Sequence, residues 1–339
     1  MTAAEPAQPR PRRSLVLTII ASLAGVALLI WQVQRVGLEE IGDGFTAVGA
    51  SGFLLVLALS LARFALRAAA WRALIPERVR FTSAVGAAMA GDAVGNLTPL
   101  SILVGEPAKA MYLSREVSAS RAFSTLAAEN FFYSVSVAIY VVLGTAAMLV
   151  AFPVPAVLRQ AGVIALVMMA GVLVAAVWMA WQRPSLLSGF ASRMPSARLR
   201  ATVGRIRAFE VETYGSAGRE GRRLAAVVLA EATFHVLSFV EVWFVLWLLA
   251  GQSLPLEAFV LDTFSRIVNV VFKIVPLRLG VDDSVSSVVA EAIALTSAVG
   301  LTVALVRRGR MLVWAAIGLA LMSRRGLTSP ADPRSPSTS

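Results

Sequence analysis

The sequence predicts an all-α, polytopic integral membrane protein: a helical bundle of about six to eight transmembrane segments with at least one re-entrant hairpin. Of the 339 residues, 58% are hydrophobic and only 15% are charged, and the mean hydropathy is +0.75. A soluble domain carries about 25% charged residues, so this chain has too little polar surface to coat a water-soluble fold. Apolar runs of about 20 residues, the length that crosses a bilayer, recur between Arg-rich loops.

The first apolar run follows a basic tail. Residues 1–13 are rich in Pro and Arg, and we expect them to be disordered. The run over 15–32 resembles a signal peptide, but it exceeds the about 7–15 residues of a signal core and no small-residue cleavage site follows it. We therefore predict a retained first span. One transmembrane domain is predicted over 14–325, followed by a polar, disordered tail over 326–339.

The charged loops between the later spans predict the orientation of the chain. Cytoplasmic loops carry an excess of Arg and Lys, and the richest basic loop runs over 183–223. Together with the basic tail, it predicts a cytoplasmic N-terminus. The topology after Ala250 stays open. Arginines stand on both sides of a short apolar segment, Met311–Met322, and either group could mark the cytoplasmic side: Arg307, Arg308 and Arg310 before it, or Arg324 and Arg325 after it. The clear later spans are Gly52–Trp71, Ser124–Phe152, Ala161–Trp181, Leu224–Ala250 and Val285–Val306.

Residues 81–113 are apolar but broken, and basic residues stand on both sides of them. A chain that enters and leaves the membrane on one side is a re-entrant hairpin, and irregular backbone at membrane depth survives only inside protein or against a polar cavity. The alternative is a long cytoplasmic loop with an amphipathic helix. On the re-entrant interpretation, the candidate substrate-binding residues of this segment are Asp92, Asn96, Pro99, Gly105, Glu106 and Lys109.

Ionisable residues inside apolar runs are costly and by default face a bundle interior or a cavity. Arg63 and Arg67, one helical turn apart, suit a lipid phosphate, although snorkelling to the interface would also explain them. Glu129 is the preferred functional carboxylate, expected to pair with an Arg or Lys of the broken segment; the stretch at Glu231 repeats its pattern of acid and aromatics. Helix-pairing roles are expected for Glu241, Asp262, Arg266 and Glu291, and an interhelical hydrogen bond for His235.

A similar but less regular pattern of residues begins at Asn269. It again has Asn, then Pro-Leu, then Gly followed by an acid, which favours a second motif, although chance similarity explains it as well. The candidate residues of this second motif are Lys273, Pro276, Gly280 and Asp282.

Several chemistries are excluded or unsupported. The chain has no Cys and a single His, which excludes disulfides and thiolate sites and argues against a metal site. The net charge is +11, but the cations cluster between apolar runs instead of lining one polar face, so no nucleic-acid partner is expected. No metal, nucleotide or other cofactor site is recognisable, so we expect no cofactor. The same observation favours a protein without enzymatic activity but leaves a membrane enzyme open as an alternative.

The charged and broken segments resemble the membrane region of bacterial lysylphosphatidylglycerol synthases. The resemblance covers about 15–322, and its motifs are Arg67…Trp71-Arg72, Gly91-Asp92, Asn96-Leu97-Thr98-Pro99, Gly105-Glu106-Pro107-Ala108-Lys109, Tyr112-Leu113 and Ala128-Glu129-Asn130. In the second motif, the family's glycine cluster and glutamate are replaced by Gly280 and two aspartates. The soluble aminoacyl-transferase domain of those enzymes is not expected here.

The resemblance implies a flippase-like protein that moves a phospholipid or an isoprenoid- or hopanoid-type lipid between leaflets. It implies a multi-pass protein of the bacterial cytoplasmic (inner) membrane. Expected partners are membrane lipids, anionic phospholipid at the cytoplasmic face among them, and lipid-biosynthesis enzymes. Two alternatives stay open: a non-catalytic component of a lipid-synthesis or cell-envelope complex, and a membrane enzyme acting on a lipid-linked substrate.

Overall fold

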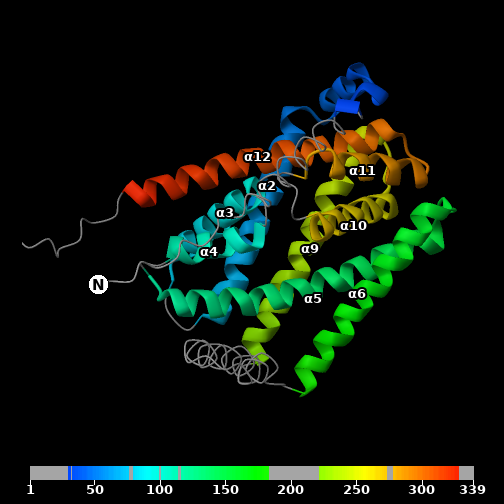
Figure 1. The fold of residues 1–339 in the computed structure, drawn as a ribbon. Coiled ribbons are helices and arrows are strands. Elements are labelled where there is room, and N and C mark those ends of the chain that lie inside the picture. The colour runs from blue at the N-terminus through cyan, green and yellow to red at the C-terminus, as the bar shows by residue number, and fades with distance from the viewer. Residues whose placement is uncertain are drawn as a thin grey trace, which may run out of the picture.

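The structure is a computed structural model that describes residues 30–31, 33–75, 79–98, 101–113, 116–182, 221–272 and 278–327. Within these ranges the regular elements are helices, which confirms the predicted all-α class (Figure 1). The predicted first span, the basic loop and both tails lie outside the described residues, apart from a few residues at their edges.

Long apolar helices form the membrane-crossing part of the bundle. α2, α5, α6 and α9 each contain a stretch long and apolar enough to cross a bilayer, which confirms a multi-pass membrane protein and four of the predicted spans. The surface of α6 is the best suited to face lipid, since most of its apolar side chains are exposed, among them Val167, Val174 and Val177. The four helices are α2 (Leu38–Leu74), α5 (Ala119–Ala151), α6 (Ala156–Gln182) and α9 (Gly221–Ala250).

The broken segment folds as two short helices, α3 (Phe81–Leu97) and α4 (Ser101–Leu113). They pack antiparallel at very close range: a Cβ on Gly91 would lie 2.8 Å from the Gly105 carbonyl oxygen, and one on Gly86 would lie 2.5 Å from the Tyr112 hydroxyl. With 17 and 13 residues, neither helix matches the about 20 residues of a span. The hairpin is therefore present as a structural unit, while its re-entry into the membrane stays a prediction.

The last part of the chain differs from the sequence-based expectation. The predicted span Val285–Val306 is wrong, because α11 (Val281–Ala292) ends there and α12 (Ser297–Leu327) begins. The turn between them places Ala294 at φ 64°, and the Thr296 hydroxyl accepts the Val299 amide proton as α12 starts. The expected loop before Met311–Met322 is also absent, since α12 runs through its arginines without a break.

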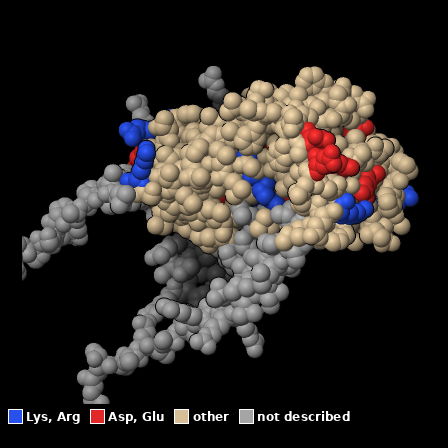
Figure 2. Space-filling model, turned by 90° about the horizontal axis from the view of Figure 1, so that it is seen from above, with Lys and Arg blue, Asp and Glu red and all other residues tan. Residues whose placement is uncertain are grey.

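The core lies where α2, α9, α10 (Pro255–Val271), α11 and α12 meet. Fully buried side chains from these helices include Val56, Leu246, Leu261, Val289 and Val306. α12 crosses close over α3, where a Cβ on Gly318 would lie 2.4 Å from the Met89 carbonyl oxygen. Figure 2 shows a face of the molecule that is mostly uncharged, with its Lys, Arg, Asp and Glu in small separate groups. The interior carries the charges described next.

Candidate functional site

Arg67 and Glu129 form a bidentate ion pair between α2 and α5. The Arg67 Nε lies 2.8 Å from Glu129 Oε1, and its Nη2 lies 2.9 Å from Oε2. Glu129 is only 2% exposed, and the Arg67 guanidinium also stacks 4.3 Å from the Tyr133 ring centroid. The expected pairing of Glu129 with a cation of the broken segment is therefore wrong. Lys109 instead pairs with Glu106 on its own helix, and the planar guanidinium of Arg67 can bind both oxygens of Glu129 at once.

Arg63, one turn before Arg67, points to a different helix. Its Nη1 lies 3.1 Å from Glu241 Oε2 on α9, and its guanidinium stacks 4.5 Å from the Phe234 ring centroid. Arg310 of α12 donates to the same Glu241 oxygen. The pairing role expected of Glu241 is thus confirmed, and the two neighbouring arginines of α2 hold two different helices, α5 and α9.

The three arginines in the middle of α12 each reach another helix. Arg307 lies 3.2 Å from Asp262 on α10, and Arg308 lies 2.7 Å from Asp283 on α11, while Arg310 takes Glu241 on α9. Asp262 also accepts from Arg266 at 2.9 Å and from the Ser238 hydroxyl at 3.0 Å. The expected pairing of Asp262 and Arg266 is confirmed. Sequence reasoning missed the α12 arginines, because a run of Arg after an apolar segment is typical of a loop.

Two further residues for which a pairing role is expected are Glu291 and His235. Glu291 accepts from Arg35 at 3.3 Å in an exposed pair. His235 Nε2 lies 2.8 Å from the Ser136 hydroxyl of α5, and the ring stacks against Tyr140 with centroids 5.2 Å apart. The interhelical role expected of His235 is thus confirmed.

The α3–α4 hairpin holds its polar residues in two local pairs. Lys109 Nζ lies 2.7 Å from Glu106 Oε1, and the Asn96 amide donates to Asp92 Oδ2 at 2.9 Å on an exposed face. Gly91 and Gly105 face each other, and a Cβ on Gly91 would lie 2.3 Å from the Lys109 Cγ. Small residues here let the two helices enclose the lysine stem. Pro99 lies outside the described residues.

A small cavity lies between the α3–α4 hairpin and the Arg67–Glu129 pair. Its volume is about 20 Å³, room for a single water molecule. Its lining includes Arg67 and Trp71 from α2, Lys109 from α4 and Glu129 from α5. The structure therefore brings together four of the predicted site residues, Arg67, Glu129, Lys109 and, through its ion pair, Glu106.

The second motif meets the first one. Arg278 Nη2 donates to Asn96 Oδ1 at 3.0 Å. Gly280, at φ 74°, starts α11 and donates its amide proton to Asp283, while Asp282 accepts from the Ser265 hydroxyl at 3.1 Å. Lys273 and Pro276 lie outside the described residues. Sequence reasoning missed Arg278, although it stands between the proline and the glycine of the motif, and its φ of 49° is unusual for a side-chain-bearing residue.

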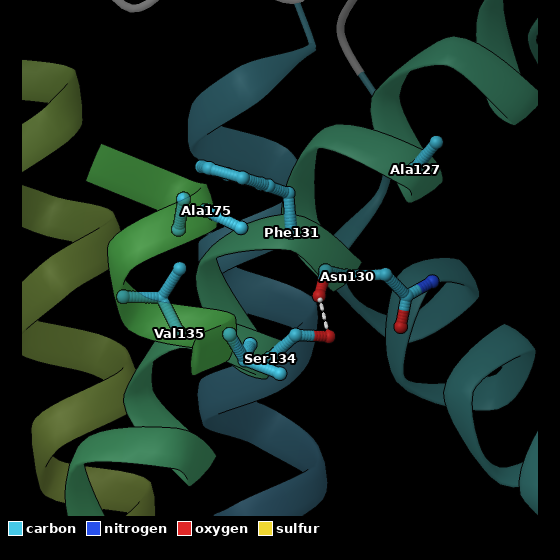
Figure 3. A pocket seen from close by; sticks show the side chains of 8 residues that line it. Ala127, Asn130, Phe131, Ser134, Val135 and Ala175 are labelled. Atoms are coloured by element: carbon cyan, nitrogen blue, oxygen red, sulfur yellow. Dashed lines mark hydrogen bonds between the residues drawn. The ribbon is translucent and has the colours of Figure 1, made fainter. Parts of the chain in front are cut away.

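An apolar groove runs between α5 and α6 beside this polar region (Figure 3). Its volume is about 370 Å³, within the about 300–1,000 Å³ typical of ligand pockets. In Figure 3, Phe131 points toward α6 and the Asn130 carboxamide points the other way. The Asn130 oxygen accepts a weak hydrogen bond from Arg67 at 3.5 Å. The groove is lined by Ala127, Asn130, Phe131, Ser134, Val135, Val172, Ala175 and Ala176.

Comparison with known proteins supports the resemblance drawn from the motifs. The family model of the lysylphosphatidylglycerol synthase TM region matches residues 16–318, most of the chain. No curated protein compared with the chain matches it. In the part of the chain that the structure describes, no group of three or more His, Cys, Asp or Glu side chains is placed to hold a metal ion.

Proposed function

We propose that this chain, which belongs to the family of the lysylphosphatidylglycerol synthase TM region, translocates a lipid between the leaflets of a membrane. The family is associated with membrane lipid metabolism, so a lipid is the substrate class to consider first. The proposed substrate is a phospholipid or an isoprenoid- or hopanoid-type lipid with an anionic head group. The observation that carries the proposal is the buried Arg67–Glu129 pair, which shares a cavity with Lys109 and adjoins an apolar groove.

The head group is proposed to bind at Arg67 and Lys109 by displacing Glu129 and Glu106, because the cavity between them has room for only one water molecule. Charged side chains inside a membrane protein are costly and mark substrate paths more often than chance. A guanidinium binds a carboxylate and a phosphate in the same bidentate way, through two oxygens. A lipid phosphate can therefore replace Glu129 on Arg67 and form the same pair of hydrogen bonds. On this proposal Glu129 and Glu106 hold the two cations in place while the site is empty of lipid.

The acyl or isoprenoid chain is proposed to lie in the groove between α5 and α6. That groove is lined mainly by small and apolar side chains, and α6 exposes apolar side chains outward, as a lipid-facing helix does. Asn130 lies at the edge between the groove and Arg67. A lipid could therefore keep its chain in the hydrocarbon layer while its head group reaches the buried cations.

The test is dithionite quenching of fluorescent lipids in liposomes that contain the purified protein. Phosphatidylglycerol and phosphatidylcholine probes are compared, since the first is anionic and the second is zwitterionic. We expect the protein to expose inner-leaflet phosphatidylglycerol to the quencher faster than liposomes that contain an unrelated membrane protein. Equal quenching in both, with either probe and with a polyprenyl phosphate, would overturn the proposal and favour an enzyme or a partner of lipid-synthesis enzymes.

A further inference from the structure

Glu231 is a buried acid without a hydrogen-bond donor. It lies on α9 within the stretch Arg223–Ala250, which is apolar enough to span a membrane, and it is 3% exposed. Neither of its carboxyl oxygens has a hydrogen-bond partner among the described residues. The other buried carboxylates of the described bundle behave differently: Glu129, Glu241, Asp262 and Asp283 each accept from an arginine.

The packing of α5 against α9 places another carboxylate beside Glu231. The Tyr133 ring, one turn after Glu129, packs edge to face on Phe234, three residues after Glu231, with ring centroids 5.7 Å apart. Glu129 and Glu231 therefore lie on facing sides of the two helices, and the arginines around them are Arg67 and Arg266. Both arginines are already engaged, Arg67 with Glu129 and Arg266 with Asp262. Two ionised carboxylates are acceptors only, so they cannot hydrogen-bond to each other. A protonated carboxyl can donate to its neighbour, and this removes both the unpaired charge and the repulsion.

Most of the other charged groups near this pair have partners of their own. On α2, Arg63 pairs with Glu241, and on α4, Lys109 pairs with Glu106. On α9 itself, His235 is one turn away; its Nε2 lies at the Ser136 hydroxyl, and its buried Nδ1 has no hydrogen-bond partner among the described residues. On α5, the Tyr133 ring stacks on Arg67. None of these contacts supplies a donor to Glu231.

We propose that Glu231 and Glu129 form a proton-binding site that couples proton uptake to the binding of an anionic lipid head group. In the empty site the two carboxyls share one proton, and their remaining negative charge is balanced by Arg67. When a lipid phosphate takes Arg67, Glu129 loses its counter-ion. One proton from water then binds the Glu129 oxygen, so the pair becomes neutral and the Arg67–phosphate pair carries no net charge. This inference rests on the proposed lipid movement for its coupling, but the shared proton does not depend on it.

The shared proton is tested first, by infrared spectroscopy of the purified protein at neutral pH without lipid transport. We expect a carbonyl stretch of a protonated carboxyl that the substitution Glu231→Gln removes. Glu291→Gln is the matched control, because Glu291 is exposed and paired with Arg35, and it should leave the band in place. A spectrum in which Glu231→Gln removes only ionised-carboxylate intensity would overturn the proposal.

The stability of the same variants gives a second readout. Gln is close in shape to a protonated Glu, so Glu231→Gln should unfold at the same temperature as the wild type. Glu129→Gln should unfold at a lower temperature, since it takes the negative partner from Arg67. If Glu231→Gln lowered the unfolding temperature as much as Glu129→Gln does, Glu231 would be an ionised partner and the proposal would be wrong.

Coupling is tested by imposing a pH difference across the liposome membrane. If one proton moves with each lipid, one pH unit shifts the leaflet ratio of fluorescent phosphatidylglycerol by up to about tenfold. We expect such a shift with the wild type and its loss in Glu231→Gln. A wild type that moves lipid with no dependence on the gradient would overturn the coupling. A wild type that moves no lipid would overturn the proposed function instead, while the infrared result would still decide the shared proton.

Discussion

Arg278 donates a hydrogen bond of 3.0 Å to the side-chain oxygen of Asn96, which joins two segments that lie 182 residues apart in the sequence. Asn96 lies in the last turn of α3, the first helix of the hairpin, and Arg278 precedes the first turn of α11. Each segment contains an Asn, a Pro and a Gly, but only the structure places them against each other. A contact between the two broken stretches suggests that they act as one unit.

We expect Arg278→Ala and Asn96→Ala to act non-additively on lipid movement. Each substitution removes the same hydrogen bond, and Asn96→Ala also removes the one to Asp92, so the double variant should lose little more activity than Asn96→Ala alone. A double-mutant cycle on the dithionite rates measures this coupling, which for contacting residues is about 0.5–3 kcal/mol. Purely additive effects would show that the contact has no role in the activity.

Breaking the Arg67–Glu129 pair should destabilise the protein strongly. Removing one partner of a buried ion pair leaves a charge without compensation and typically costs about 3–5 kcal/mol. We therefore expect Arg67→Ala to lower the unfolding temperature in detergent markedly. Arg35→Ala is the matched control, since its pair with Glu291 is exposed and worth under about 1 kcal/mol. Similar effects of the two substitutions would contradict the buried pair.

The close contact within the hairpin should not tolerate a side chain at Gly91. A Cβ there would lie 2.3 Å from the Lys109 Cγ and 2.8 Å from the Gly105 carbonyl oxygen, so Gly91→Ala must push α3 and α4 apart. We expect a lower unfolding temperature and slower lipid movement. Gly171→Ala in α6 is the control, because a Cβ at Gly171 would meet no atom within 4 Å. Wild-type unfolding temperature and lipid movement in both variants would contradict the close packing of α3 on α4.

Filling the groove between α5 and α6 should block lipid without unfolding the protein. Ala175 lines the groove, whereas Val174, the preceding residue on α6, is 69% exposed and is not part of its lining. We expect Ala175→Trp to slow lipid movement and Val174→Trp to leave it unchanged, with equal unfolding temperatures for both. Equal rates for the two variants would show that no lipid chain occupies the groove.

The sequence predicted most of the fold because apolar length and charged loops are local signals. Spans such as Gly52–Trp71 and Leu224–Ala250 were recognised from about 20 apolar residues alone. The same rule misjudged α12. In the sequence, its three arginines are typical of a loop. In the structure they form ion pairs with carboxylates on three other helices: Arg307 with Asp262, Arg308 with Asp283 and Arg310 with Glu241. Whether a charge ends a helix or pairs within a bundle depends on partners that are distant in the sequence.

The structure brings four of the predicted residues together, but not in the predicted pairings. Arg67, Lys109 and Glu129 line one cavity, and Glu106 joins them through its ion pair with Lys109. Which carboxylate meets which cation depends on how α2, α4 and α5 pack. The sequence analysis preferred Glu129 as the functional carboxylate, although Glu231 shares its local pattern of acid and aromatics. What distinguishes Glu231 is its burial without a hydrogen-bond donor, which only the structure shows.

The most direct test of the central claim is the rate at which fluorescent phosphatidylglycerol becomes accessible to dithionite in liposomes that contain Glu129→Gln. The amount, orientation and folding of the variant are matched to those of the wild type. We predict that the wild type moves the lipid and that the variant moves it at least about tenfold more slowly, a loss equal to about 1.4 kcal/mol. A folded Glu129→Gln variant that moves lipid at the wild-type rate would contradict the claim that the buried Arg67–Glu129 pair forms the lipid-handling site.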